Sequence, residues 1–407
     1  MEDATPSRTA LSERLAAATL ALFDYCRAEG WAGHDPYDAL NSEVWKALPV
    51  LDFRLFRLAL TQALKRSPLN VRSLLAVPKT RNPKGLALCL TASLNVVEQG
   101  LVRQDESPVG ELIGHLIALR SPERDYWCWG YSFPWQTRTI LVPRGAANLV
   151  CTTFVANALL DAHERGGHER GLELATSAAD YILERLYWDD GTAAGFAYPL
   201  PSSRARVHNA NFLGAALLCR VARRTGNLKY IEPALRAARY SASRQQADGS
   251  WDYGELRTQR WKDNFHTGFN LCALRNLARD AGTDEFRQHI ERGYDFYVTR
   301  FFRQDGVPRY FHDRTYPIDI HSIAQSMITL AELEDLRTDS LAIAARVFEW
   351  TMAHMRDDRG FFYYRKLPVA TIRTSYMRWS QAWMLLALST LLGASRRARP
   401  VAAPHVG

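Results

Sequence analysis

Four turns of similar sequence decide the fold of this chain. They are WDDGTAAGF (188–196), QADGSWDYGE (246–255), RQDGVPRYF (303–311) and RDDRGFFYY (356–364). Each turn contains an Asp followed by a Gly, either directly or with one residue between them. Asp bonds its own backbone and Gly accepts a positive φ, so these are favourable turns. Their recurrence predicts a repeat in which a turn and an aromatic loop connect two helices.

An amphipathic helix begins after each loop, near His208, His266, His321 and Arg378, at intervals of 58, 55 and 57 residues. A less regular copy begins near Asn148. The segment FNLCALRNLARDAG is nearly continuously apolar, which is typical of a helix that neighbours bury on all sides. The segment EFRQHIERGYDFYVTRFF has a charged face, as expected of a helix exposed to solvent. The chain therefore alternates inner and outer helices.

The fold class that follows is all-α, an (α/α)6 toroid of six helical hairpins with long aromatic loops at one mouth. The inner helices are predicted near residues 84–101, 148–165, 208–225, 266–282, 321–336 and 376–394. The outer helices are predicted near residues 108–120, 169–186, 228–246, 284–302 and 339–355. Gly226 and Gly282 are placed to end two inner helices. Short strand hairpins are possible in the aromatic loops.

The N-terminal part of the chain is expected to complete this ring, through helices at 10–29 and 43–66. We divide the chain into an N-terminal segment with a first helix (1–30), the toroid (31–394) and a disordered basic, Pro/Ala-rich tail (395–407). The tail contributes part of the positive charge.

Composition and missing motifs exclude several classes of protein. The chain has 407 residues and a net charge of +8, from 51 Lys and Arg against 43 Asp and Glu. Its basic residues form no stripe with a known motif, so we expect no nucleic-acid partner. No stretch approaches about 20 uncharged apolar residues, so no transmembrane segment is predicted. The polar, acidic N-terminus does not resemble a secretory signal, which favours a cytoplasmic protein. The six cysteines form no CxxC pair, and we predict no metal and no cofactor.

The inner helices of such a ring point the same way, so their N-termini and the loops before them meet at one mouth. Aromatic side chains are concentrated in these loops and can stack on sugar rings. The candidates for substrate binding are Trp129, Trp135, Trp251, Tyr253, Trp261 and Tyr310. The alternative is that many of them plug the toroid or pin long loops.

Charged residues of the mouth suggest an anionic saccharide. Arg138, Arg260 and Arg378 are candidates to bind a carboxylate, because a guanidinium offers two parallel donors. The mouth loops hold 14 Lys and Arg against 10 Asp and Glu, so salt bridges within the loops are an equal alternative. The polar segment WAGHDPYDALNS (31–42) adds Asp35 and Tyr37, either to the mouth or as a helix cap.

Histidines open three successive inner helices. His266 and His321 are candidate bases, because a helix N-terminus disfavours the charged imidazolium and keeps the ring neutral. His208 holds the matching position and is assigned to substrate binding. Asp263 and Asp319 are further catalytic candidates, although an Asp before a helix is more often its cap.

A proton donor is also needed. Tyr316 is the candidate acid, since the Pro that follows holds its backbone extended.

Several segments together resemble a known family. GHDPYDALNS, KTRNPKGLALCL, CWGYSFPWQTRTILVPRG, CTTFVANALLDA, QQADGSWDYGE and WKDNFHTGFNL are similar to bacterial proteins encoded in exopolysaccharide clusters, the polysaccharide biosynthesis protein VpsJ group. That group is also labelled as prenyltransferase or squalene-oxidase repeat proteins. The resemblance spans roughly residues 30–390. It implies an αα toroid and a role in surface polysaccharide, and it carries no catalytic assignment.

We therefore predict a carbohydrate-active enzyme that acts on an acidic glycan or its precursor. A lyase or C5-epimerase would use a base and an acid to move the C5 proton, with Arg neutralising the uronate carboxylate. One alternative is a glycoside hydrolase with two carboxylates at the mouth. Another is a non-catalytic glycan-binding or assembly factor. A prenyl or terpenoid enzyme is disfavoured, since no acidic diphosphate-binding motif is present. The oligomeric state stays open.

Overall fold

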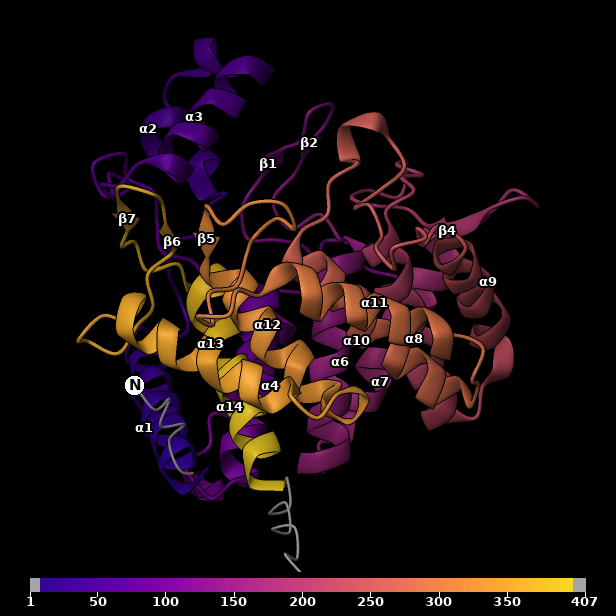
Figure 1. The fold of residues 1–407 in the computed structure, drawn as a ribbon. Helices are drawn as coiled ribbons and strands as arrows, with labels where there is room; N and C mark the ends of the chain where they lie inside the picture. The colour runs from indigo at the N-terminus through magenta and orange to yellow at the C-terminus, as the bar shows by residue number, and fades with distance from the viewer. Residues whose placement is uncertain (1–7, 398–407) are drawn as a thin grey trace, which may run out of the picture.

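The computed structural model describes residues 8–397 and confirms the all-α toroid (Figure 1). The inner ring consists of α4 (Pro83–Glu98), α6 (Leu149–Gly166), α8 (His208–Thr225), α10 (Asn264–Ala281), α12 (Ile320–Glu332) and α14 (Ala382–Arg397). Each of these helices packs against the next in this order, and α14 packs back against α4. The ring is therefore closed on itself.

A second layer of helices surrounds the ring. It consists of α5 (Val109–Ala118), α7 (Arg170–Tyr181), α9 (Ile231–Ala242), α11 (Arg287–Phe301), α13 (Ser340–His354) and α1 (Arg8–Ala28). In this order they pack against α4, α6, α8, α10, α12 and α14. Burial follows the predicted pattern: every residue of α12 from Ile320 to Ala331 is buried, whereas α11 buries one side only.

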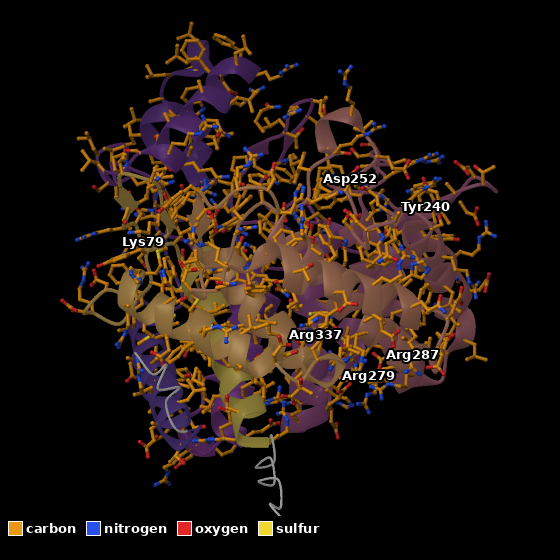
Figure 2. The ribbon with its side chains drawn as sticks, in the orientation of Figure 1. Lys79, Tyr240, Asp252, Arg279, Arg287 and Arg337 are labelled. Carbon is orange, nitrogen blue, oxygen red and sulfur yellow. The ribbon has the colours of Figure 1, made fainter. Side chains whose placement is uncertain are left out.

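The caps of the inner helices show which end of the ring is the mouth. Asn82, Asn148, Asp263 and Asp319 accept backbone N–H groups at the starts of α4, α6, α10 and α12. Glycines with φ between 65° and 72° end α6, α8 and α10, which confirms the predicted caps at Gly226 and Gly282. Figure 2 shows Asp252 on the mouth side and Arg279 toward the opposite end.

Three of the four Asp-Gly turns pack closely against the outer helix of the next hairpin. A Cβ atom at Gly249 would lie 2.3 Å from the carbonyl oxygen of Arg292 on α11, and one at Gly306 would lie 2.6 Å from that of Arg346 on α13. The turn at Gly360 makes the equivalent approach to Ala21 on α1, at 3.0 Å. Helix α1 therefore occupies the sixth outer position, although it comes first in the sequence.

The segment predicted as a helix over 43–66 does not complete the ring. It consists of α2 (Glu43–Lys46), a short helical turn at Pro49–Leu51, and α3 (Arg54–Arg66). Pro49 has no N–H to donate, which interrupts the helix. Helices α2 and α3 lie beyond the ring at the mouth (Figure 1), where α3 packs against the Asp38–Asn41 turn and β1.

Short antiparallel strands stiffen the mouth loops. β1 (Trp135–Gln136) pairs with β2 (Leu141–Val142), and β3 (Tyr187–Asp189) pairs with β4 (Ala194–Phe196). β5 (Ile318–Asp319) pairs with β6 (Arg365–Lys366), and β6 pairs with β7 (Thr371–Ile372). The last sheet ties the loop before α12 to the loop before α14. Two π-helical segments, Ile182–Leu186 and Met377–Gln381, adjoin α7 and α14.

The C-terminal boundary predicted at residue 394 falls within α14, which continues to Arg397. The rest of the predicted tail lies outside the described residues. In the part of the chain that the structure describes, no helix has the length and apolar character needed to cross a membrane.

The turn glycines provide a matched test of this packing. Gly249 has φ +88° and touches α11, whereas Gly191 has φ +86° and open space around its Cβ position. We expect Gly191→Ala to lower the free energy of unfolding by about 1–2 kcal/mol, the cost of left-handed backbone. Gly249→Ala should cost about 1–3 kcal/mol more, because α11 must move. Urea denaturation measures both, and equal losses would contradict the proposed packing role.

Candidate active site

The mouth is built where loops of several hairpins cover the N-termini of the inner helices. His321 and His266 lie in the first turns of α12 and α10, and Arg378 lies in the π-helical segment before α14. The ring of Phe265 contacts both imidazoles, at centroid distances of 4.2 Å to His266 and 4.4 Å to His321, and the ring of Trp379 contacts both His321 and the guanidinium of Arg378. These three predicted residues therefore belong to one neighbourhood.

His321 is enclosed by aromatic rings. Its imidazole stacks on Phe265 and Trp383 at centroid distances of 4.4 and 4.5 Å, and Trp379 meets it edge-on at 4.6 Å. Neither ring nitrogen has a hydrogen-bond partner among residues 8–397. Burial, reinforced by the charges of Lys84, Arg378 and His266, holds the pKa of His321 well below its usual value. The ring is therefore neutral near pH 7 and has two unused nitrogens.

His266 forms a carboxylate–imidazole pair with Asp263. Its Nδ1 lies 2.7 Å from Asp263 Oδ2, which also accepts Trp261 Nε1 at 3.0 Å. The other oxygen of Asp263 accepts the backbone N–H of His266 at 2.9 Å and caps α10. The side chain of His266 is 21% exposed. With the proton on Nδ1, donated to this carboxylate, Nε2 has the lone pair of a base, and no side chain of residues 8–397 bonds it.

Asp319 caps α12 and has no free oxygen. Its Oδ1 accepts the backbone N–H of His321 and the indole N–H of Trp379, both at 3.0 Å. Its Oδ2 accepts two N–H groups of Arg365, at 2.9 and 2.5 Å. Asp319 therefore positions Trp379, and it offers no proton-accepting atom to a substrate.

Arg378 forms an ion pair with Asp35, as Arg365 does with Asp319. Its Nε and Nη2 donate to the two oxygens of Asp35 at 2.6 and 2.8 Å, and both side chains are buried. Burial opposes the charge of Arg378, but Asp35 more than compensates, so the pKa of Arg378 rises. A second pair, Arg72 with Asp38, adjoins it. The predicted carboxylate clamp thus holds a carboxylate of the chain itself.

Tyrosines line the rim of the mouth. Burial raises the pKa values of Tyr131, Tyr253 and Tyr310, so these phenols stay protonated and can donate hydrogen bonds. Tyr253 stacks on Trp261 at 4.7 Å with an interplanar angle of 10°. Tyr37 extends the rim, since Lys65 Nζ donates to its hydroxyl and its ring lies 5.6 Å from that of Trp379.

Two tryptophans and one histidine that were predicted to bind substrate are core residues instead. Trp129 is fully buried and donates to the carbonyl of Leu116. Trp251 is 2% exposed and donates to the carbonyl of Ser241. His208 is buried, with Nδ1 3.2 Å from Ser241 Oγ, and burial lowers its pKa to about 4. All three contact an outer helix, α5 for Trp129 and α9 for Trp251 and His208, so they fasten the loops and the start of α8 to the outer layer, and the alternative of structural aromatics applies to the two tryptophans.

The remaining predicted residues lie further out. Arg138 and Arg260 are exposed, and Tyr316 is 38% exposed. Trp135 is half-buried on β1, 6.2 Å from the ring of Tyr131. No hydrogen bond joins Tyr316 to His321 within the described residues, so its assignment as the acid finds no support in the geometry.

Lys84 is a residue of this site that was not predicted from the sequence. This lysine lies in the first turn of α4 and is 3% exposed, with Nζ 4.2 Å above the ring of Phe154 and 5.2 Å from Trp383. Burial, followed by the charge of Arg378, lowers its pKa to about 7. The available signal was a lysine within NPKGLALCL (82–90), where every later residue is apolar.

A cavity of about 670 Å³ opens at the opposite end of the ring, and the rings of Phe154, Phe269 and Trp383 are part of its lining. Lys84 Nζ faces the same three rings. Within residues 8–397, no group of three or more His, Cys, Asp or Glu side chains is arranged to hold a metal ion.

The lowered pKa of Lys84 predicts a pH dependence of stability. Between pH 7 and 10.5 the unfolded chain binds a proton that the folded chain has released, so the free energy of unfolding should rise with pH in this range. Below about pH 7 the contribution is constant. In Lys84→Met this rise should be absent. Urea denaturation of both proteins from pH 6 to 9.5 measures the difference, and parallel curves would show an ordinary lysine.

Removing the partner of Arg378 should be costly. We expect Asp35→Ala to lower the free energy of unfolding by about 3–5 kcal/mol, because an uncompensated buried guanidinium remains. Asp35→Ala combined with Arg378→Met should recover part of that loss. Guanidinium denaturation of the single and double variants tests this, and strictly additive losses would mean that the two groups do not interact.

Comparison with known proteins supports the fold. No family model matches the chain, and no curated protein matches it either. A solved cellobiose 2-epimerase from Bacillus thermoamylovorans has a TM-score of 0.60 and 11% identity, covering 78% of this chain and 88% of its own. The GH76 α-mannanase BT2949 from Bacteroides thetaiotaomicron has a TM-score of 0.61 and 12% identity, and the match covers 78% of this chain and 88% of the mannanase. An unsaturated glucuronyl hydrolase from Streptococcus agalactiae has a TM-score of 0.59 and 11% identity, and the match covers 93% of this chain and 90% of the hydrolase. At these identities the likeness establishes the shared toroid.

Proposed function

We propose that this chain is a carbohydrate-active enzyme that catalyses proton transfer at a carbon of a saccharide, in an epimerase or isomerase type of reaction. The observation that carries the proposal is the pair of imidazoles at one mouth. His266 is held by Asp263 with Nε2 available, and neutral His321 has no partner on either nitrogen. Such a pair supplies a base and a hydrogen-bond donor for the same reaction.

The chemistry needs only these groups. His266 Nε2 takes the proton next to the carbonyl of an open-chain sugar, and Asp263 stabilises the imidazolium that results. Neutral His321 donates an N–H to the carbonyl oxygen, on which negative charge develops. If the enediolate turns over before His266 gives the proton back, the proton reaches the opposite face and an epimer forms. If His266 gives it to the neighbouring carbon, and the hydroxyl proton of that carbon passes to the former carbonyl oxygen, an isomer forms. Lys84, with a pKa of about 7, is a further charge near this oxygen.

A neutral saccharide fits the mouth better than a uronate. Of the three arginines predicted to bind a carboxylate, Arg378 is buried and paired with Asp35, whereas Arg138 and Arg260 lie on the exposed surface. The guanidinium of Arg365 is paired with Asp319. Lys84 is the buried cation of the mouth that has no carboxylate partner among the described residues. We therefore propose neutral reducing sugars as the first candidate substrates and uronates as the second.

A paired-carboxylate hydrolase is less well supported. Such an enzyme needs one protonated carboxyl group and one free carboxylate at the mouth. Asp35, Asp38 and Asp319 are each held by an arginine. Glu255 accepts a hydrogen bond from Tyr240 and lies 3.3 Å from Arg206. A non-catalytic sugar-binding role, and the link to exopolysaccharide that the sequence resemblance implies, remain alternatives for the experiment below.

Deuterium exchange tests the proposal directly. Incubation in D2O with a panel of neutral reducing sugars and uronates should place deuterium at the carbon next to the carbonyl, as detected by NMR. We expect His266→Asn and His321→Asn to reduce that rate by about 100-fold or more. His354→Asn, on the exposed surface of α13, is the matched control and should keep the full rate.

The other outcomes identify the alternatives. An unsaturated product detected by ultraviolet absorbance means a lyase, and new reducing ends without deuterium mean a hydrolase. Binding of a sugar without any of these products means a binding protein. No exchange with any member of the panel rejects proton transfer on these sugars.

A further inference from the structure

Exposed apolar side chains are concentrated in one short segment. Thirteen large hydrophobic residues are exposed in the described chain, and eight of them lie between residues 44 and 74. They are Val44, Leu48, Val50, Phe53, Leu55, Phe56, Leu69 and Leu74, and we call them the α2–α3 surface. The other five are scattered, as is normal for a soluble surface, whereas such a concentration marks an interaction site.

Helix α3 shows that this exposure is organised. Thr61 and Leu64 are buried toward the toroid, where Leu64 packs with Ala39 and Val77. The opposite side of the helix presents Leu55, 65% exposed, and Phe56, 45% exposed. The helix is therefore apolar on both sides, and only one side has a partner within the described residues.

The most exposed side chains of this surface come from turns and loops around α3. Val50, Leu69 and Leu74 are between 72% and 80% exposed. Val50 lies in the short helical turn at Pro49–Leu51, and Leu69 and Leu74 lie in the segment after α3, where Leu69 also lines a pocket with Pro68 and Asn70. Exposed apolar side chains that extend from turns and loops are suited to insertion among lipid chains.

The same segment is strongly basic. Residues 43–79 contain seven Lys and Arg and two acidic residues, Glu43 and Asp52. Arg72 is buried against Asp38 and adds no surface charge. The surface of the segment therefore carries six basic and two acidic groups, a net charge of +4. Arg54 and Arg66 are exposed and form no ion pair within residues 8–397.

We propose that the α2–α3 surface, with its basic residues, docks on an anionic phospholipid membrane. The apolar side chains enter the boundary between head groups and acyl chains, and the basic side chains contact the lipid phosphates and carboxylates. A second copy of the chain is a poor partner for this surface, because each copy would bring a net charge of +4 to the interface and the two surfaces would repel each other. An anionic bilayer supplies the opposite charge over its whole area.

Docking of this kind would place the mouth against the bilayer. Lys65 of α3 donates to the hydroxyl of Tyr37 on the rim, and Arg57 Nε donates to Gln136 of β1 at 2.9 Å. Helices α2 and α3 are thus fixed to the mouth end of the ring (Figure 1). If the proposed function holds, the saccharide substrate would be one presented at a lipid surface, such as a lipid-linked sugar.

Vesicle co-sedimentation of the full chain tests the proposal and needs no substrate. The protein should sediment with phosphatidylcholine vesicles that contain phosphatidylserine and should bind pure phosphatidylcholine at least about tenfold more weakly. Leu55→Asp with Phe56→Asp should reduce binding about tenfold or more, as should Arg54→Glu with Arg66→Glu. All four side chains are exposed, so the variants should remain folded, as circular dichroism checks.

Matched variants elsewhere on the surface provide the controls. Leu228→Asp changes an apolar side chain that is 77% exposed on the outer wall, and Arg287→Glu with Arg300→Glu makes the same charge change on α11. Both should bind vesicles as the parent chain does. Absence of binding to anionic vesicles overturns the proposal, as does equal loss in the controls. A dimer in solution that Leu55→Asp dissociates also overturns it, since a second copy would then cover the surface. None of these outcomes depends on sugar turnover.

Discussion

The buried ion pair between Arg378 and Asp35 is the constraint on which the mouth depends. It joins residues 343 positions apart in the chain and fastens the segment before α14 to the loop that follows α1. The backbones approach closely at the same place. A Cβ on Gly33 would lie 2.7 Å from Met377 Cβ, and one on Gly85 would lie 3.3 Å from the Cα of Arg378. The same contacts therefore close the ring and position Arg378.

This closure also determines what chemistry remains available. Each arginine that reaches the interior of the mouth meets an aspartate of the chain, so the strong charges cancel one another. The polar groups that remain outside these arginine–aspartate pairs are the neutral His321, His266, which Asp263 orients, and Lys84, which lies over the ring of Phe154. Neutral imidazoles, and a lysine whose pKa burial lowers to about 7, are suited to acid–base catalysis rather than to binding a permanent charge. The rim of protonated tyrosines adds hydrogen-bond donors around them.

Helix ends and turns were the most predictable features. The Asp-Gly turns, the glycine caps at Gly226 and Gly282, and the order of inner and outer helices follow from local backbone chemistry, and the structure has them as expected. The site was less predictable. Trp251 and Trp261 come from the same aromatic loop before α10, yet Trp251 is a core residue and Trp261 is only partly buried, and Trp129, from the loop before α6, is a core residue as well. Composition alone does not distinguish a side chain that packs in the core from one that lines the mouth.

The repeat, the toroid and the histidines at the starts of inner helices could be predicted from the chain alone, because turns, caps and helical periodicity are local properties. The position of α1 as the sixth outer helix, the position of α2 and α3 over the mouth, and the pairing of Arg378 with Asp35 emerged only from the folded structure. These depend on which distant segments meet when the ring closes. The pKa of Lys84 belongs to the same group, since burial and the charge of Arg378 lower it only after α4 and α14 pack together.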